Sequence, residues 1–212
     1  MYEKGGFMTR KLQLLTILWM LVGTAIMFFH QGNTTGLSAG GLMNLRYFTV
    51  LSNEFCGIVA IVSLIRRRKG KKAPLLAEYM AAVAVGLTFL TVAVFLGPVY
   101  GHIKLYKYAN FFFHLVLPVT AMAAFVLDGE EDIPFRYTFY TVIPAVVYGI
   151  GYVANILING KGEWPDTNDW YGFLNWGIPG GVIIFLVIGL ATWGLAVFLR
   201  FCRRRICLRR KT

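Results

Sequence analysis

Charged residues are scarce in this sequence. Asp, Glu, Lys and Arg account for 15% of the 212 residues, and hydrophobic residues account for 57%. Soluble domains carry roughly 25% charged residues. The few charges are also clustered, so long uncharged stretches separate them. This composition excludes an ordinary soluble protein, and the length predicts one domain over residues 1–212.

Cysteine is also rare. Cys56 lies in a hydrophobic stretch, and Cys202 and Cys207 lie in a basic C-terminal segment. None of them has histidine or carboxylate neighbours at metal-ligand spacing, so a zinc site is not expected. If the C-terminal segment is intracellular, its thiols stay reduced. We therefore expect no metal site and no bound cofactor.

Six long hydrophobic stretches dominate what remains. Each has 18 to 23 residues, enough to cross a hydrocarbon core of ~30 Å at about 1.5 Å per residue. β-Barrel strands are about half that length and alternate in polarity. The sequence predicts an all-α integral membrane protein, a bundle of six transmembrane helices. They are predicted at residues 12–29, 47–65, 75–97, 109–127, 137–157 and 178–199.

The distribution of Lys and Arg predicts the orientation. With the N-terminus inside, seventeen of the 21 basic residues fall on inner segments. This bias predicts that both termini are cytoplasmic and that residues 200–212 form a basic cytoplasmic tail. The net charge of +11 is then explained by topology and by contact with anionic lipids at the cytoplasmic face. No nucleic-acid partner is expected. The acidic run at residues 128–132 is expected to be a solvated loop.

Several polar residues fall at one depth of the predicted membrane. The second helix enters from outside, so Thr49 lies about one turn in and Asn53 about two. His114 lies one to two turns below the outer start of its helix. Asn155 is in the last turn of the fifth helix, and His30 ends the first. Because polar groups are costly in hydrocarbon, their gathering in the outer third calls for an explanation.

Spacing groups these residues further. Arg46, Thr49 and Asn53 are three and four residues apart, so a continuous helix places them on one face. Asn110 and His114 are related in the same way. If both faces point inward, a hydroxyl, an imidazole and two amides meet in one cavity. Such a set is suited to nucleophilic catalysis, with amide or backbone donors stabilising an oxyanion.

Structural explanations stand beside the catalytic one. A threonine in a membrane helix usually bonds the carbonyl four residues before it, and a buried histidine often only bridges helices. Asn53 and Glu54 can lock helices together, and an ionised Glu54 would need Arg46, a cluster of donors or protonation. The outer loop around Trp170 is either an interfacial aromatic belt or a cap over a cavity.

Three segments resemble a known family. Arg46 to Asn53 (RYFTVLSN) resembles the "ryfT-x-x-SN" segment of a bacterial membrane family that is similar to the androgen-induced and androgen-dependent membrane proteins of animals. Phe112 to Pro118 resembles its "H-x-x-x-P" helix, departing at Phe113, where many relatives have a second histidine. Trp164-Pro165 through Phe173 resembles an aromatic outer loop of the bacterial relatives.

The resemblance implies a function. The animal members are membrane-embedded hydrolases of fatty-acid esters of hydroxy fatty acids. Carried over, this implies Thr49 as the nucleophile and His114 as the general base, acting on a lipid ester in a bacterial inner membrane. Other residues are expected to stabilise the oxyanion, orient the imidazole or bind substrate. They are Arg46, Ser52, Asn53, Glu54, Asn110, Asn155 and Trp170.

Two other classes of function remain open. The first is a non-catalytic protein or carrier that binds lipids or small molecules, with a polar site formed by Arg46, Glu54 and His114. The second is a scaffold whose basic tail binds anionic lipid. In that case polar residues inside the helices would serve stability alone.

Overall fold

The computed structural model describes residues 3–29, 41–101, 105–129, 131–163 and 167–209, with the side chains of residues 3–7, 99 and 100 left out. All regular structure in these ranges is helical. Six helical segments are long and apolar enough to cross a membrane, which confirms the predicted number of spans. They are Met8–Phe29, Phe48–Arg68, Leu75–Leu96, Ala109–Asp128, Tyr137–Asn159 and Phe173–Arg209.

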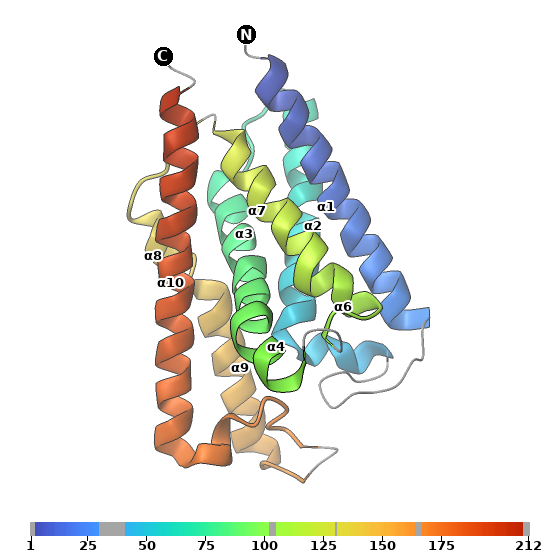
Figure 1. The fold of residues 1–212 in the computed structure, drawn as a ribbon, viewed down its shortest axis with the longest axis vertical. Helices are drawn as coiled ribbons and strands as arrows, with labels where there is room; N and C mark the ends of the chain where they lie inside the picture. The colour runs from blue at the N-terminus through green and yellow to red at the C-terminus, as the bar shows by residue number, and fades with distance from the viewer. Residues whose placement is uncertain (1–2, 30–40, 102–104, 130, 164–166, 210–212) are drawn as a thin grey trace.

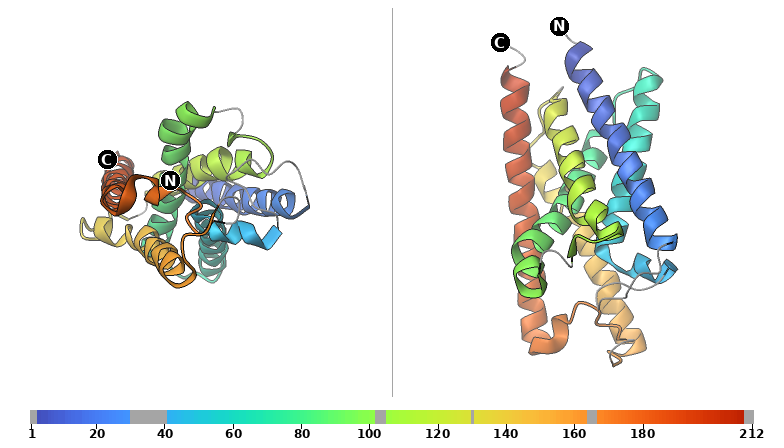
Figure 2. Two further views of the ribbon diagram at one scale, coloured as in Figure 1. Left: turned by 90° about the horizontal axis from the view of Figure 1, so that it is seen from below. Right: turned by 45° about the vertical axis from the view of Figure 1, so that its right-hand side comes forward.

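The helices run along the long axis of an elongated bundle (Figure 1). Helices α1 (Glu3–Phe29), α2 (Phe48–Arg68), α3 (Leu75–Leu90) and α7 (Leu117–Asp128) pack against one another. Helix α10 (Gly177–Arg209) packs on α3 and α7. Seen along the axis, α3 lies between α10 on one side and α2 on the other (Figure 2).

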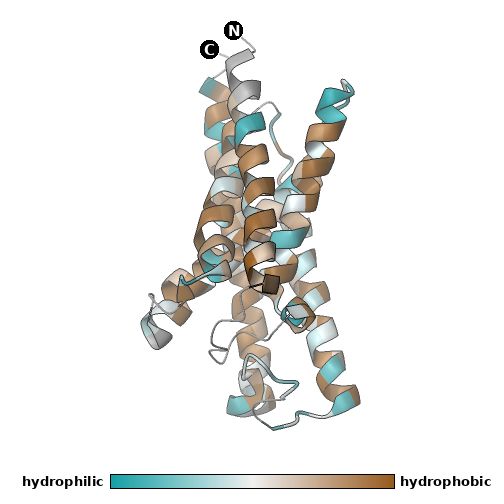
Figure 3. Cartoon of the chain, turned by 90° about the vertical axis from the view of Figure 1, so that its right-hand side faces the viewer, coloured by the Kyte–Doolittle hydropathy of each residue, from teal (hydrophilic) through white to brown (hydrophobic). Residues whose placement is uncertain are grey.

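The bundle has two distinct ends. The start of α1 and the end of α10 lie at the same end of the bundle, and so does the basic turn at residues 66–72 (Figure 1). We call this end the basic end. The opposite end carries the 3-10 helix η1 (Gly41–Arg46) and the loop that contains Trp170, and we call it the aromatic end. Hydrophobic residues cover most of the helical length, and hydrophilic residues gather mainly toward the two ends (Figure 3).

Small residues such as Ala82 and Gly86 allow α3 to approach its neighbours closely. A Cβ atom added at Gly86 would lie 2.7 Å from Leu195 of α10 and 2.8 Å from the sulfur of Met122 of α7. Such close packing is the usual basis of helix association in membranes. The buried ring of Tyr79, stacked on Phe125, completes this contact.

The third and fourth spans are not regular α-helices at the aromatic end. A π-helix, η2 (Thr91–Leu96), joins α3 to the short α4 (Gly97–Tyr100). A second π-helix, η3 (Phe112–Val116), joins α6 (Ala109–Phe111) to α7. The fifth span breaks between α8 (Tyr137–Tyr140) and α9 (Ile143–Asn159). Short π-helical turns are frequent at functional sites.

The last helix runs beyond its predicted end. It continues to Arg209, so residues 200–209 of the predicted basic tail belong to the last helix. Arg203 is 1% exposed. Its guanidinium donates to Asp128 Oδ2 at 2.9 Å and to the carbonyl of Phe125 at 2.6 Å. Because its charge and hydrogen bonds are matched in this way, the arginine can be buried.

The same contacts correct the expectation of a solvated acidic loop. Asp128 is 3% exposed and accepts from Arg67 at 2.9 Å as well as from Arg203. One carboxylate therefore joins α2, α7 and α10 at the basic end. The rest of the acidic run is more open, since the side chain of Glu131 is 49% exposed and that of Asp132 is 45% exposed.

Replacing Asp128 with asparagine should therefore destabilise the bundle. Removing one partner of a buried ion pair typically costs about 3–5 kcal/mol, because the other charge stays buried and unmatched. We expect a loss of that order in the free energy of unfolding, measured in detergent by denaturant titration. Asp132→Asn is the matched control, since its pair with Arg204 is half exposed and should contribute about 1 kcal/mol or less. Equal effects of the two substitutions would contradict this account.

Candidate functional site

Thr49 is the second residue of α2, which begins at Phe48. Arg46 ends η1 and is separated from α2 by Tyr47, which has an extended backbone. The continuous helical face predicted for Arg46, Thr49 and Asn53 is therefore interrupted. Thr49 and Asn53 do lie one turn apart on α2.

Four other threonines within the spans hydrogen-bond the carbonyl four residues earlier, at 2.7 to 2.9 Å. The hydroxyl of Thr49 makes no such bond among the described residues. The residue four before Thr49 is Leu45, which belongs to η1 and not to α2, because α2 starts only one residue before Thr49. No hydrogen bond of its hydroxyl is found within the described part of the chain. The four bonded pairs are Thr16 to Leu12, Thr24 to Met20, Thr120 to Val116, and Thr192 to Ile188.

The start of α2 also presents a backbone donor. The N–H of Phe48 donates to the hydroxyl oxygen of Tyr171 at 2.9 Å. The N–H groups of Val50 and Leu51 donate to the carbonyl of Tyr47 at 3.1 and 3.2 Å. Among the described residues, no acceptor is found for the N–H of Thr49. The first N–H groups of a helix lack partners within the helix and favour negative charge.

His114 lies in the middle of η3 and is 7% exposed. Its Nδ1 is 2.7 Å from the carbonyl oxygen of Leu105. A carbonyl only accepts, so we assign the proton of the neutral ring to Nδ1, and Nε2 then keeps its lone pair. A general base needs a lone pair of this kind. No hydrogen bond joins His114 to Thr49 in the described ranges.

Asn53 connects the segments that carry these two residues. It is 0% exposed. Its Nδ2 donates to the carbonyl of Thr49 at 2.7 Å and to that of Phe113 at 3.0 Å. Because Phe113 precedes His114, this amide ties the first turn of α2 to the backbone beside the imidazole. Both amide hydrogens are used, so Nδ2 is not available as an oxyanion donor in this state.

Two other predicted polar residues are engaged by neighbouring helices. The hydroxyl of Ser52 donates to the carbonyl of Thr49 at 3.0 Å and lies 3.1 Å from that of Thr88 on α3. The carboxylate of Glu54 contacts the hydroxyl of Thr24 on α1, whose single proton is shared between this carboxylate and the carbonyl of Met20. The partner found for this carboxylate is thus a donor from another helix rather than Arg46.

Asn110 does not share a regular helical face with His114. It lies in α6 and is partly buried, whereas His114 lies in η3. The α-helical spacing of four residues does not apply across the change from α- to π-helix. The π-helix could not be read from the hydrophobic pattern.

The loop that contains Trp170 folds back over the start of α2. The guanidinium of Arg46 lies 5.6 Å from the ring centroid of Trp170 and 5.2 Å from that of Tyr47. The hydroxyl of Tyr148 on α9 donates to the carbonyl of Arg46 at 2.6 Å and accepts from Trp170 Nε1 at 3.0 Å. Burial raises the pKa of Tyr171 well above its ordinary value, so its hydroxyl stays neutral. The loop that contains Trp170 therefore packs directly against the start of α2.

Asp169 anchors this loop and was not singled out from the sequence. It is 3% exposed. It accepts from the hydroxyl of Tyr152 and from the N–H groups of Phe173 and Leu174 at 2.9 and 3.0 Å. Asn155, a predicted site residue, also holds this loop, because its Nδ2 donates to Asn168 Oδ1 at 3.1 Å. The sequence does offer one signal for Asp169. An aspartate in a loop shortly before a helix often accepts hydrogen bonds from nearby backbone N–H groups.

Some predicted features lie outside the described residues, namely His30, Trp164 and Pro165. Among the described residues, no group of three or more His, Cys, Asp or Glu side chains is placed to hold a metal ion. Comparison with protein-family models, curated proteins and solved structures finds no match to this chain.

Proposed function

We propose that this protein is a membrane-embedded hydrolase of lipid esters, with Thr49 as the nucleophile and His114 as the general base. The observation that supports it most is the hydroxyl of Thr49. It has no hydrogen-bond partner among the described residues, whereas four other threonines of the spans bond their own helix. Asn53 holds the same turn against the residue that precedes His114.

The proposed reaction has two steps. In the first, Thr49 Oγ1 attacks the ester carbonyl carbon while His114 Nε2 takes the hydroxyl proton. The N–H of Thr49 faces the developing oxyanion, a role that the nucleophile's own N–H has in serine proteases. The imidazolium then gives its proton to the departing alkoxide, which leaves as an alcohol. An acyl-threonine remains.

In the second step, water attacks the acyl-threonine. His114 Nε2 takes a proton from the water and returns it to Thr49 Oγ1, which releases the fatty acid. Thr49 and His114 need not be hydrogen-bonded before substrate binds, because catalytic hydrogen bonds often tighten only in the complex. The acyl chain would enter between helices, and water would arrive from the aromatic end.

The polar end of the substrate would bind near the cap. Arg46 Nε is buried and has no hydrogen-bond partner among the described residues, although its guanidinium lies over Tyr47 and Trp170. We assign Arg46 and Trp170 to this role. With cytoplasmic termini in a bacterial inner membrane, the site would serve the outer leaflet.

The experiment that tests this function asks whether the protein hydrolyses a lipid ester or only binds it. Purified protein in detergent is incubated with a fatty-acid ester of a hydroxy fatty acid, and the released hydroxy fatty acid is measured by mass spectrometry. We expect release that saturates with substrate concentration. If the ester is instead retained in native mass spectra and no product forms, the protein is a lipid-binding protein and the hydrolase proposal fails.

A further inference from the structure

A hollow of about 310 Å³ opens at the basic end, away from the proposed catalytic site. Its walls come from α1, the end of α2 with the turn after it, the start of α3, the end of α7, and α10. Pockets for small ligands usually measure roughly 300–1,000 Å³, so this one is large enough for a single head group. Five cations line it, namely Arg10, Arg67, Lys71, Lys72 and Arg203.

Three carboxylates line the same hollow, and cations already match them. Asp128 accepts from both Arg67 and Arg203 at 2.9 Å. Glu131 pairs with Lys72. Glu78 lies 3.8 Å from Arg67. Five cations against three carboxylates leave an excess of two positive charges on the walls.

The two positive charges in excess are those of two exposed side chains. Arg10 on α1 and Lys71 in the turn after α2 both line the hollow, and both are exposed. Within the ranges that the structure describes, neither makes an ion pair. They come from segments about sixty residues apart in the sequence, and the fold brings them to one hollow.

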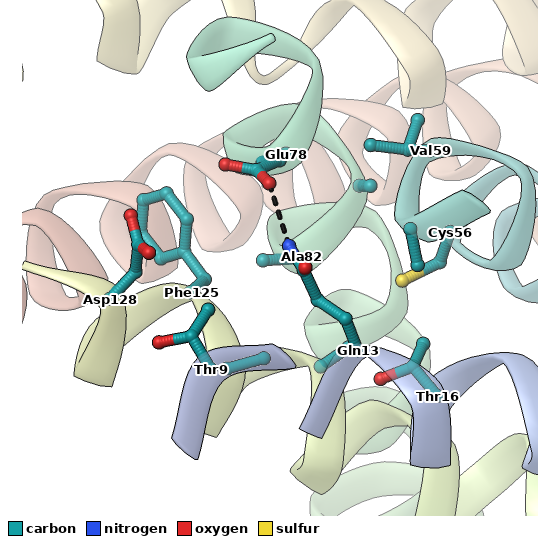
Figure 4. Close-up of a pocket in the computed structure, with 13 residues that line it drawn as sticks. Thr9, Gln13, Thr16, Cys56, Val59, Glu78, Ala82, Phe125 and Asp128 are labelled. Carbon is teal, nitrogen blue, oxygen red and sulfur yellow. Dashed lines mark hydrogen bonds between the residues drawn. The ribbon is translucent and has the colours of Figure 1, made fainter. Parts of the chain in front are cut away.

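A smaller polar pocket adjoins the floor of the hollow, and Glu78 and Asp128 line both of them. In Figure 4, Gln13 of α1 points toward Glu78 of α3, and its amide donates to the carboxylate at 2.9 Å. This inner pocket measures about 30 Å³, the space of about one water molecule. A ligand is therefore confined to the outer hollow, above a floor whose carboxylates have partners.

We propose that this hollow binds an anionic phosphate group, with Arg10 and Lys71 supplying the unmatched charge. The hollow lies where the membrane-spanning helices end, and in a membrane this position would bring it to the level of the lipid head groups. Basic pockets between transmembrane helices on the cytoplasmic side bind anionic head groups. The same chemistry would accept free phosphate.

The test measures the apparent affinity for phosphatidylglycerol added to the delipidated protein in detergent, by native mass spectrometry. Phosphatidylcholine and inorganic phosphate form the other arms. The double variant Arg10→Gln/Lys71→Gln is compared with Arg68→Gln/Lys69→Gln. The control pair removes the same charge from exposed residues that do not line the hollow.

A charge near an anionic lipid surface contributes about fivefold to binding, so losing both should weaken phosphatidylglycerol binding about 30-fold. The control variant should lose clearly less, and phosphatidylcholine should bind weakly throughout. If inorganic phosphate suppresses lipid binding in the wild type and not in the Arg10→Gln/Lys71→Gln variant, the site is assigned to free phosphate. Equal losses in the two double variants would show diffuse surface attraction and overturn the proposal. Thermal unfolding of both variants checks that each is folded.

Discussion

Replacing Thr49 with alanine should abolish ester hydrolysis and leave the bundle folded. Removal of a catalytic nucleophile lowers kcat by roughly 10⁴- to 10⁶-fold in well-studied hydrolases. The hydroxyl of Thr49 has no hydrogen bond among the described residues, so its loss should cost little stability. The rate of hydroxy fatty acid release and the unfolding midpoint in detergent are the two measurements.

Two further variants sharpen this expectation. Thr49→Ser keeps the nucleophilic oxygen, so it should keep measurable activity. Thr120→Ala removes a hydroxyl from α7 that bonds the carbonyl of Val116 at 2.7 Å. Thr120→Ala should leave the rate of ester hydrolysis within a few-fold of that of the wild type, because substitutions away from special structural features usually have small effects. Full activity of Thr49→Ala would rule out this nucleophile.

Replacing His114 with asparagine should lower the rate of hydrolysis by about 10²- to 10⁴-fold, the usual contribution of a general base. Asparagine is the informative choice because its side-chain nitrogen can take the place of Nδ1. It can keep donating to the carbonyl of Leu105, which His114 meets at 2.7 Å. It has no equivalent of Nε2.

The variant therefore separates catalysis from folding. We expect the rate to fall while the unfolding midpoint stays near that of the wild type. Loss of activity together with a large loss of stability would assign His114 to the structure of η3. An unchanged rate would remove His114 from the mechanism.

The six spans could be predicted because hydrophobic length is a local property of the sequence. Burial of Asp128 could not, since it depends on Arg67 and Arg203, which are 61 and 75 residues away along the chain. The acidic run reads as solvated when it is considered by itself. The pairing of Asp128 with Arg203 and Arg67 allows Asp128 and Arg203 to be buried.

The position of Thr49 and His114 along their spans could be predicted from the sequence. The hydrogen bonds and the helix types around them could not. Thr49 and His114 both lie toward the aromatic end of their spans, as the predicted topology places them. The state of the Thr49 hydroxyl depends on α2 starting at Phe48, and helix ends are poorly determined by sequence. The π-helix around His114 leaves no mark on the hydrophobic pattern. Asn53 was expected either near the oxyanion or as a link between helices, and in the structure it links α2 to η3.

The most direct test of the central claim is to locate a covalent adduct. The purified protein is treated with a lipid-like fluorophosphonate, digested, and sequenced by mass spectrometry. We predict phosphonylation of Thr49 Oγ1, blocked by prior incubation with a long-chain ester and lost in Thr49→Ala. Labelling of another residue, or labelling that survives Thr49→Ala unchanged, would contradict the assignment of Thr49 as the nucleophile.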